Sequence, residues 1–93
     1  MSPDHAETIA LNALSWIATD PERSGPFLAA SGLDGAALAA RAGEPDFLGF
    51  VLEHLLAMGD EAILSFCDTA GVAPEDVMAA RAALPGGDLP NWT

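Results

Sequence analysis

The sequence predicts an all-α fold, a compact orthogonal bundle of five or six short helices. No stretch of the chain alternates apolar and polar residues in the manner of a half-buried strand. Signals that start and end helices recur along it instead, and two corners between helices share one pattern. A chain of 93 residues can bury one core, so we expect a single helical domain over residues 1–85 and a tail containing proline and glycine over residues 86–93.

The shared pattern consists of an aromatic residue, a glycine and two aliphatic residues, and it recurs 39 positions later. Its members are Phe27, Gly32, Leu33 and Leu38, and then Phe66, Gly71, Val72 and Val77. Glycine closes a helix in the left-handed conformation because it has no Cβ, and the aliphatic residue after it packs on both flanking helices. We therefore expect a pseudo-repeated half, with helix-turn-helix-like corners and positive φ angles at Gly32 and Gly71.

The first helix is expected to run from the start of the chain to about residue 19. Ser2 is suited to the N-cap, and Pro3 and Asp4 are suited to the first turn, where a proline loses no hydrogen bond and the helix dipole favours an acid. One side of this helix is apolar and should face the core: Ile9, Ala10, Ala13, Leu14, Trp16 and Ile17.

A short second helix is expected to begin with Asp-Pro-Glu at residues 20–22, which repeats the same start signal. Gly25 and Pro26 weaken this helix, because both residue types disfavour a helix interior. After the first corner, Asp34 can cap a third helix over residues 34–42.

The fourth helix, over about residues 45–58, is apolar nearly all round, which is typical of a helix at the centre of a bundle. We expect it to be the most buried element, with Leu52, Leu55 and Leu56 almost inaccessible to solvent. The first helix is its counterpart in the other half of the chain, so the two should pack against each other.

Two further helices are expected over residues 60–70 and 74–84, on either side of the second corner. Pro74 begins the last helix, and Glu75 and Asp76 lie in its first turn, where they interact favourably with the helix dipole. The Pro-Gly-Gly sequence that follows ends it.

The composition is strongly acidic: 14 acidic residues against three arginines give a formal net charge of −11, and the chain contains no lysine. Such a charge opposes binding to nucleic acid and to anionic membranes. The single cysteine cannot form an internal disulfide, which favours a cytoplasmic location. The sequence shows no signal peptide, and its longest apolar stretch is too short to span a bilayer.

Few residues are candidates for chemistry. Cys67 lies on an apolar stripe of the expected fifth helix, so we interpret it as a buried hydrophobic residue. His5 and His54 are the only histidines, and no spacing of potential ligands indicates a metal site, so we expect no cofactor. We expect His54 to border the core, with its polar tip near a carboxylate or a carbonyl.

One face of the expected first helix consists of uncharged polar residues: Thr8, Asn12, Ser15 and Thr19. This face is either an ordinary solvated surface or a contact surface. Uncharged polar groups lose less than charged groups on desolvation, so a charge-free face in so acidic a chain favours the second interpretation.

The tail keeps two large apolar residues, Leu89 and Trp92, although its proline and glycines oppose a helix. It is either a disordered end, which is usual for termini, or an anchor whose tryptophan docks on this domain or on a neighbouring molecule. We count Leu89 and Trp92 with the uncharged face as candidate interaction residues.

Short capping and core signals extend over about residues 6–86: Asp20-Pro21-Glu22-Arg23, Phe27-Leu28-Ala29, Gly32-Leu33-Asp34, Phe47-Leu48, Leu55-Leu56, Asp60-Glu61, Ala70-Gly71-Val72 and Pro74-Glu75. With this set of signals the chain resembles the domain-of-unknown-function 3572 family, which is found mostly in alphaproteobacteria. The Gly25-Pro26 pair departs from the helical run that is usual there. The family brings no assigned activity, cofactor or catalytic residue, so the resemblance implies no function.

No catalytic motif stands out, so the sequence favours a small acidic cytoplasmic protein that acts as a protein–protein interaction module or self-associates as a homodimer. The alternative is a small-ligand binder or an enzyme that uses His54 and nearby acids in a pocket between the halves. A large apolar surface patch would favour the module. A pocket that holds His54 beside a carboxylate would favour the alternative.

Overall fold

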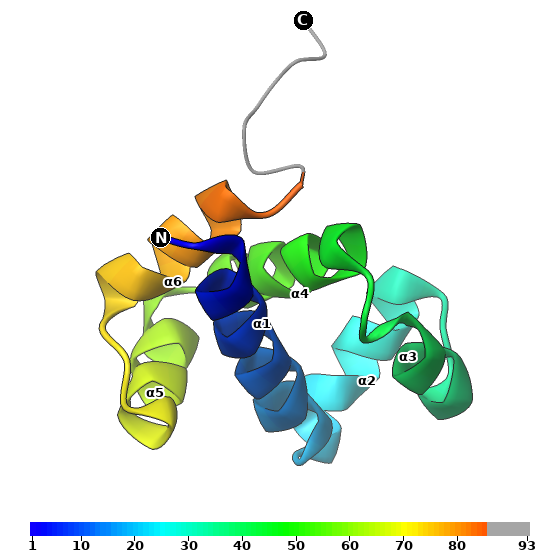
Figure 1. Cartoon of the computed structure of the whole chain (residues 1–93). Coiled ribbons are helices and arrows are strands. Elements are labelled where there is room, and N and C mark those ends of the chain that lie inside the picture. Colours follow the sequence, from blue (N-terminus) through cyan, green and yellow to red (C-terminus); the bar gives the residue numbers. More distant parts are fainter. Residues whose placement is uncertain (86–93) are drawn as a thin grey trace, which may run out of the picture.

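Six α-helices make up residues 1–85, the part of the chain that the computed structural model describes: α1 (Pro3–Ala18), α2 (Pro21–Ser31), α3 (Gly35–Arg41), α4 (Pro45–Ala57), α5 (Asp60–Ala70) and α6 (Pro74–Ala83) (Figure 1). Residues 1–85 contain no strand, and the prediction of an all-α bundle is confirmed. None of these six helices is long and apolar enough to cross a membrane.

The helices α1 and α4 form the centre of the bundle. α5 and α6 lie at one end of the molecule, and α2 and α3 lie at the other (Figure 1). α1 packs against α2, α4, α5 and α6, so the predicted contact between the first and fourth helices is confirmed. This arrangement leaves surface grooves where neighbouring helices diverge.

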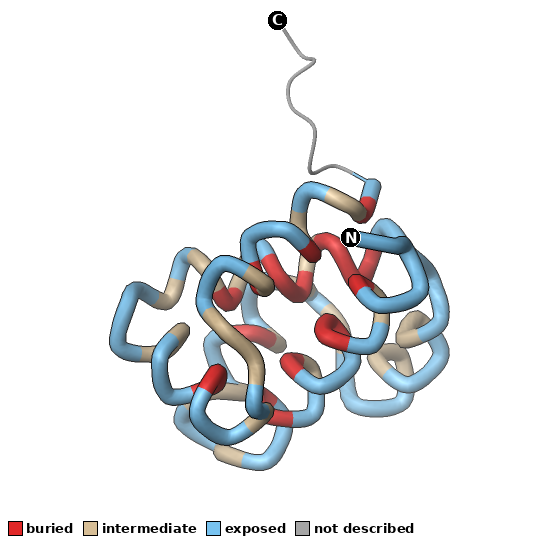
Figure 2. The backbone as a smooth tube through the Cα atoms, turned by 60° about the vertical axis from the view of Figure 1, so that its left-hand side comes forward, coloured by how far each residue is buried: buried red, intermediate tan, exposed pale blue. Residues whose placement is uncertain are grey.

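One cluster of buried apolar side chains fills the space between the helices (Figure 2). α1 and α4 each contribute six buried residues, although α4 is the shorter helix. Leu52 and Leu55 are inaccessible to solvent, as predicted. The prediction for Leu56 was wrong, because this side chain is only partly buried. It lies on a side of α4 that α5 and α6 do not cover completely, and it lines a groove there.

The two corners share their backbone conformation and the hydrogen bond from the glycine N–H to the carbonyl four residues earlier, and they differ in the acceptor for the next N–H. Gly32 and Gly71 both have a φ angle of 72°, as predicted. At the second corner, the Val72 N–H donates to the Cys67 carbonyl at 3.2 Å. At the first corner, the Leu33 N–H donates to the hydroxyl of Ser31, also at 3.2 Å. A side chain therefore replaces a helix carbonyl as the acceptor in the first copy.

The second helix runs without a break through Gly25 and Pro26, although these residues were expected to weaken it. Proline removes one N–H, which leaves the carbonyl of Glu22 without its helical partner, but Glu22 is exposed to water. Gly25 has no Cβ to clash with the proline ring that follows it. Asp20 secures the start of the helix, because its carboxylate accepts a hydrogen bond from the Glu22 N–H at 2.9 Å.

Side chains also cap other helices. Ser2 and Asp34 each accept a hydrogen bond from the backbone N–H three residues later, at 3.2 and 2.8 Å respectively. Ala73 at the start of α6 has no capping group of its own. The carboxylate of Asp76 compensates, because it accepts the Ala73 N–H at 3.1 Å.

Helix α4 and the end of α6 approach each other closely at Gly49. A Cβ on this residue would lie 2.6 Å from the carbonyl oxygen of Pro85 and 3.6 Å from the Cβ of Leu84. Glycine inside a helix costs about 0.5–1 kcal/mol relative to alanine. The close contact between the two helices explains why this position carries a glycine all the same.

Candidate interaction surfaces

The uncharged polar face that the sequence singled out is exposed on α1: Thr8, Asn12, Ser15 and Thr19. The last three residues line a groove of about 400 Å³ between α1 and α5, with Thr69 of α5 also in its lining. Thr8 is not part of this lining, and its hydroxyl donates to the carbonyl of Asp4 at 3.1 Å. No charged residue lines the groove. We call it the α1–α5 groove.

The apolar part of the α1–α5 groove is formed by Trp16 and Phe66, whose rings meet edge to face with their centroids 5.8 Å apart. The guanidinium of Arg23 lies 3.9 Å from the centroid of the Trp16 ring, and its Nε donates to the Trp16 carbonyl at 3.1 Å. Trp16 is only 8% exposed, and Phe66 is almost completely buried. A partner in this groove would therefore remove little further aromatic surface from water.

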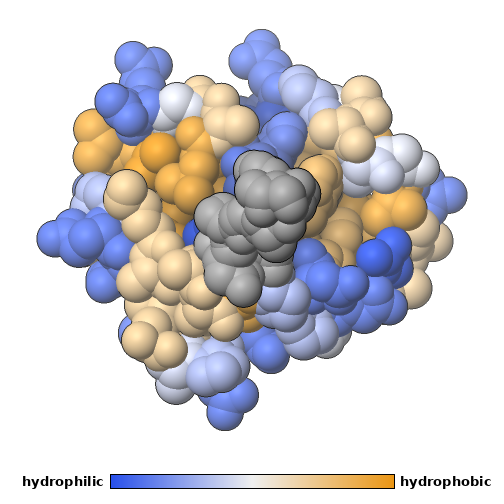
Figure 3. All heavy atoms as spheres, turned by 90° about the horizontal axis from the view of Figure 1, so that it is seen from above, coloured by the Kyte–Doolittle hydropathy of each residue, from blue (hydrophilic) through white to orange (hydrophobic). Residues whose placement is uncertain are grey.

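A second groove, of about 300 Å³, lies between the end of α4, α5 and α6, and we call it the α5–α6 groove. Its lining is mostly apolar: Leu56, Asp60, Ile63, Leu64, Pro74 and Met78. Leu64 is 57% exposed and Met78 is 58% exposed, so both present most of their side chains to solvent. Seen from above, hydrophobic residues bordered by hydrophilic ones gather at the end of the molecule where α5 and α6 lie (Figure 3).

The sequence analysis missed Leu64 and Met78. Each follows directly after an inward-facing residue, Ile63 or Val77, and so lies about 100° further round its helix. That offset could have marked them as apolar residues outside the core stripe. The groove itself depends on the angle between α5 and α6, which the local sequence does not specify.

His54 lies among aromatic rings and not beside an acid. Its ring centroid is 5.0 Å from that of Phe27 and 6.4 Å from that of Phe50. The Nε2 atom is buried and has no hydrogen-bond partner in residues 1–85, so the carboxylate or carbonyl expected near it is missing. A cavity of about 210 Å³ lies between α2, α3 and α4, and His54 is not in its lining. The lining residues are Ala30, Ser31, Leu33, Arg41, Asp46, Phe47 and Phe50.

Acidification is expected to destabilise the fold through His54. Burial lowers the pKa of His54 below its ordinary value of 6.5, so the unfolded chain takes up this proton more readily than the folded protein. The stabilising contribution of neutral His54 is complete above about pH 6.5 and declines as the pH falls toward the lower pKa of the folded state. Urea unfolding measured between about pH 7.5 and pH 5.5 gives the free energy of unfolding over this range.

The matched variants are His54→Gln and His5→Gln, since His5 is exposed on α1. Neither glutamine titrates in this range. The free energy of unfolding should fall less steeply with acidification in His54→Gln than in the wild type, whereas His5→Gln should follow the wild type. If the free energy of unfolding depended on pH in the same way in all three proteins, the loss of stability in acid could not be assigned to His54.

Cys67 is a free thiol on α5 and is only 6% exposed, as the sequence analysis expected. Burial raises the pKa of this thiol, and the negative charges of Asp76 and Glu75 raise it further. A thiol with a raised pKa stays protonated at neutral pH and is a poor nucleophile. Cys67 therefore packs as a small hydrophobic side chain.

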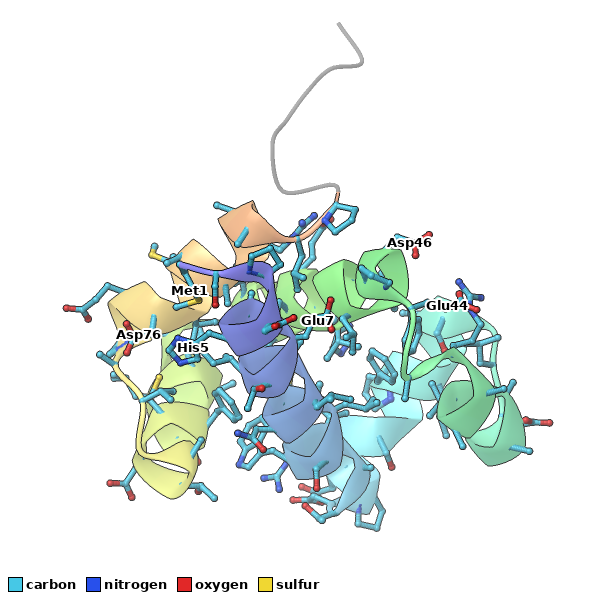
Figure 4. All side chains as sticks on the ribbon, in the orientation of Figure 1. Met1, His5, Glu7, Glu44, Asp46 and Asp76 are labelled. Atoms are coloured by element: carbon cyan, nitrogen blue, oxygen red, sulfur yellow. The ribbon has the colours of Figure 1, made fainter. Side chains whose placement is uncertain are left out.

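The three arginines are all engaged with acidic residues: Arg23 with Asp20 at 3.4 Å, Arg41 with Glu44 at 2.6 Å, and Arg81 with Glu53. The other carboxylates of residues 1–85 have no arginine partner. Figure 4 shows that acidic side chains are spread over several helices: Glu7 on α1, Glu44 and Asp46 at the start of α4, and Asp76 on α6. Acidic side chains without an arginine partner are therefore present on several helices.

Two candidate residues, Leu89 and Trp92, lie outside the residues that the structure describes. Their predicted role as an anchor stays a prediction. Within residues 1–85, no group of three or more histidine, cysteine or acidic side chains is placed to hold a metal ion.

The fold and its surfaces define a small, acidic, all-α domain with an apolar groove and a charge-free groove. The chain belongs to the family described as Protein of unknown function (DUF3572), whose model matches residues 3–87. The family that the capping and core signals suggested is thereby confirmed. No curated protein and no solved structure matches the chain.

Proposed function

We propose that this protein is a small cytoplasmic protein–protein interaction module that binds its partner through the α5–α6 groove. The observation that carries the proposal is the exposure of Leu64 and Met78, at 57% and 58%, on a groove that is otherwise lined mainly by apolar side chains. Exposed apolar side chains gathered around one groove are typical of a contact surface.

The sizes of the available apolar surfaces favour the α5–α6 groove over the α1–α5 groove. Burial of a whole leucine or methionine side chain contributes about 1.5–3 kcal/mol, so Leu64 and Met78 would each contribute about 1 kcal/mol when a partner covers them. Trp16 in the α1–α5 groove is already buried by Arg23 and Phe66, and it would contribute much less. The polar face of α1 then serves as an ordinary solvated surface.

The surroundings of His54 give the alternative function little support, because this residue contacts phenylalanines and has no carboxylate partner at Nε2. The single buried thiol, Cys67, supports a reducing cytoplasm as the location. The acidic charge supports a partner other than nucleic acid or an anionic membrane. A net charge of −11 on each copy opposes self-association through the same groove.

A comparison of three baits tests the proposal. The full chain, its Leu64→Ser/Met78→Ser variant and its Leu11→Ser variant are each used to capture proteins from native lysate, and the captured proteins are quantified by mass spectrometry. Leu11 is the matched control, because it is 43% exposed on α1 and is not in the lining of the α5–α6 groove. We expect the double variant to lose its specific partners by about tenfold or more, which corresponds to about 1.4 kcal/mol or more.

The circular dichroism spectra of the three baits should agree, since all of the substituted side chains are exposed. Loss of partners with Leu11→Ser but not with the double variant would move the contact surface to α1. The same set of captured proteins with all three baits would overturn the proposal.

A further inference from the structure

We infer that the occupant of the α5–α6 groove is a basic segment of another protein, with lysines or arginines flanking a few apolar side chains. This inference rests on the proposed function and adds the chemistry of the partner. The apolar side chains would cover Leu64 and Met78. The basic side chains would meet the acidic residues at the groove.

The acidic residues come from the first turns of both helices that form the groove. Asp60 and Pro74 line the groove itself, and Glu75 and Asp76 follow Pro74 in α6. Glu61 lines a different groove, beside Trp16 and Arg23. Asp60 and Glu75 are exposed, and neither of them forms an ion pair within residues 1–85. Negative charge therefore lies beside the exposed apolar side chains of the α5–α6 groove.

The helix dipoles reduce this charge but do not cancel it. Each helix N-terminus carries about half a positive charge, so α5 and α6 together supply about one positive charge near the groove. The three carboxylates of Asp60, Glu75 and Asp76 outweigh it and leave about two negative charges. The chain has no lysine, and the arginine of α6, Arg81, forms an ion pair with Glu53 of α4. A partner must therefore supply the cations.

The same charges argue against a second copy of this chain as the occupant. A two-fold contact through this groove would bring the same first-turn carboxylates together across the interface, and like charges that face each other disfavour association. A basic partner experiences the opposite effect, because the negative charge steers it toward the groove and holds it there.

The test uses three labelled synthetic peptides of equal length, whose leucines recur with helical spacing. The first combines the leucines with lysines, the second replaces every lysine by glutamine, and the third replaces every lysine by glutamate. Fluorescence anisotropy with the full chain measures their affinities. We expect the lysine peptide to bind at least about tenfold more tightly than the glutamine peptide, and the glutamate peptide not to bind. Raising the salt concentration from about 0.05 M to about 0.5 M should weaken the binding of the lysine peptide, because salt screens exposed charges.

Two pairs of protein variants locate the binding. The charge pair is Asp60→Asn/Glu75→Gln and its control Glu7→Gln/Asp46→Asn, which removes two charges from α1 and the start of α4 instead. The apolar pair is Leu64→Ser/Met78→Ser and its control Leu11→Ser. Binding of the lysine peptide should weaken at least about fivefold in the first member of each pair and change less than about twofold in its control.

The outcomes separate this inference from the proposed function. Equal affinities of the lysine and glutamine peptides, both reduced by Leu64→Ser/Met78→Ser, would overturn the basic partner and would leave the groove as the contact surface. If the Leu64→Ser/Met78→Ser variant binds the lysine peptide as tightly as the wild type does, the peptide is attracted by net charge alone. That result would overturn both the inference and the proposed function. If light scattering shows that the wild type is a dimer and that Leu64→Ser/Met78→Ser is a monomer, the occupant of the groove is a second copy of the chain. That result would overturn the inference but not the proposed function.

Discussion

Leu55→Ala is expected to lower the free energy of unfolding by about 2–5 kcal/mol, the usual range for truncation of a buried leucine. Leu55 is inaccessible to solvent in α4, and it belongs to the cluster of buried side chains that α1 and α4 dominate. Removal of its isobutyl group leaves a cavity in that cluster, because the surrounding helices can relax only in part. Denaturant unfolding followed by the helical circular dichroism signal measures the loss.

The matched control is Leu64→Ala, which makes the same chemical change on an exposed part of α5. It removes little buried surface and should cost less than about 0.5 kcal/mol, as most surface substitutions do. A loss below about 1 kcal/mol for Leu55→Ala would mean that the centre of the core lies elsewhere.

Gly49→Ala is expected to destabilise the fold by about 1–3 kcal/mol, the usual range for overpacking. On helix propensity alone the change would stabilise α4 by about 0.5–1 kcal/mol. The added Cβ would lie 2.6 Å from the carbonyl oxygen of Pro85, however, and this atom belongs to the backbone that follows α6 and not to the end of a flexible side chain. The steric effect should therefore exceed the gain in propensity.

Gly35→Ala is the control, because no atom lies within 4 Å of a Cβ at this position in the first turn of α3. It should be neutral or stabilise the fold by up to about 1 kcal/mol. Thermal unfolding of both variants shows whether each substitution raises or lowers the stability of the fold. If Gly49→Ala stabilised the protein, the backbone at Pro85 would have to move away from the added Cβ without loss of stability, which would contradict the prediction.

Features that depend on a few neighbouring residues could be predicted from the sequence. The left-handed glycines at Gly32 and Gly71 follow from the glycine and the aliphatic residue after it, and the buried positions of Leu52 and Leu55 follow from the apolar run around them. The family could be recognised because its signals are of the same local kind.

Features that depend on the angles between helices could not be predicted. Leu56 is as apolar as Leu55, and only the directions of α5 and α6 decide that one lines a groove while the other is inaccessible. The same holds for His54, whose neighbour Phe27 comes from a helix in the other half of the chain. The sequence also did not predict that the second helix continues through Pro26. The carbonyl that loses its helical partner there belongs to Glu22, an exposed residue, and exposure of this kind depends on the fold.

The third helix contributes no fully buried residue, and only Leu38 among its side chains packs, partly buried, against the core cluster. Opening of α3 would therefore expose little apolar surface, whereas opening of α1 or α4 would disrupt the whole core. The amides of α3 can then exchange with solvent through local excursions that leave the other five described helices intact. We therefore expect hydrogen exchange to be faster in residues 35–41 than in α1 or α4.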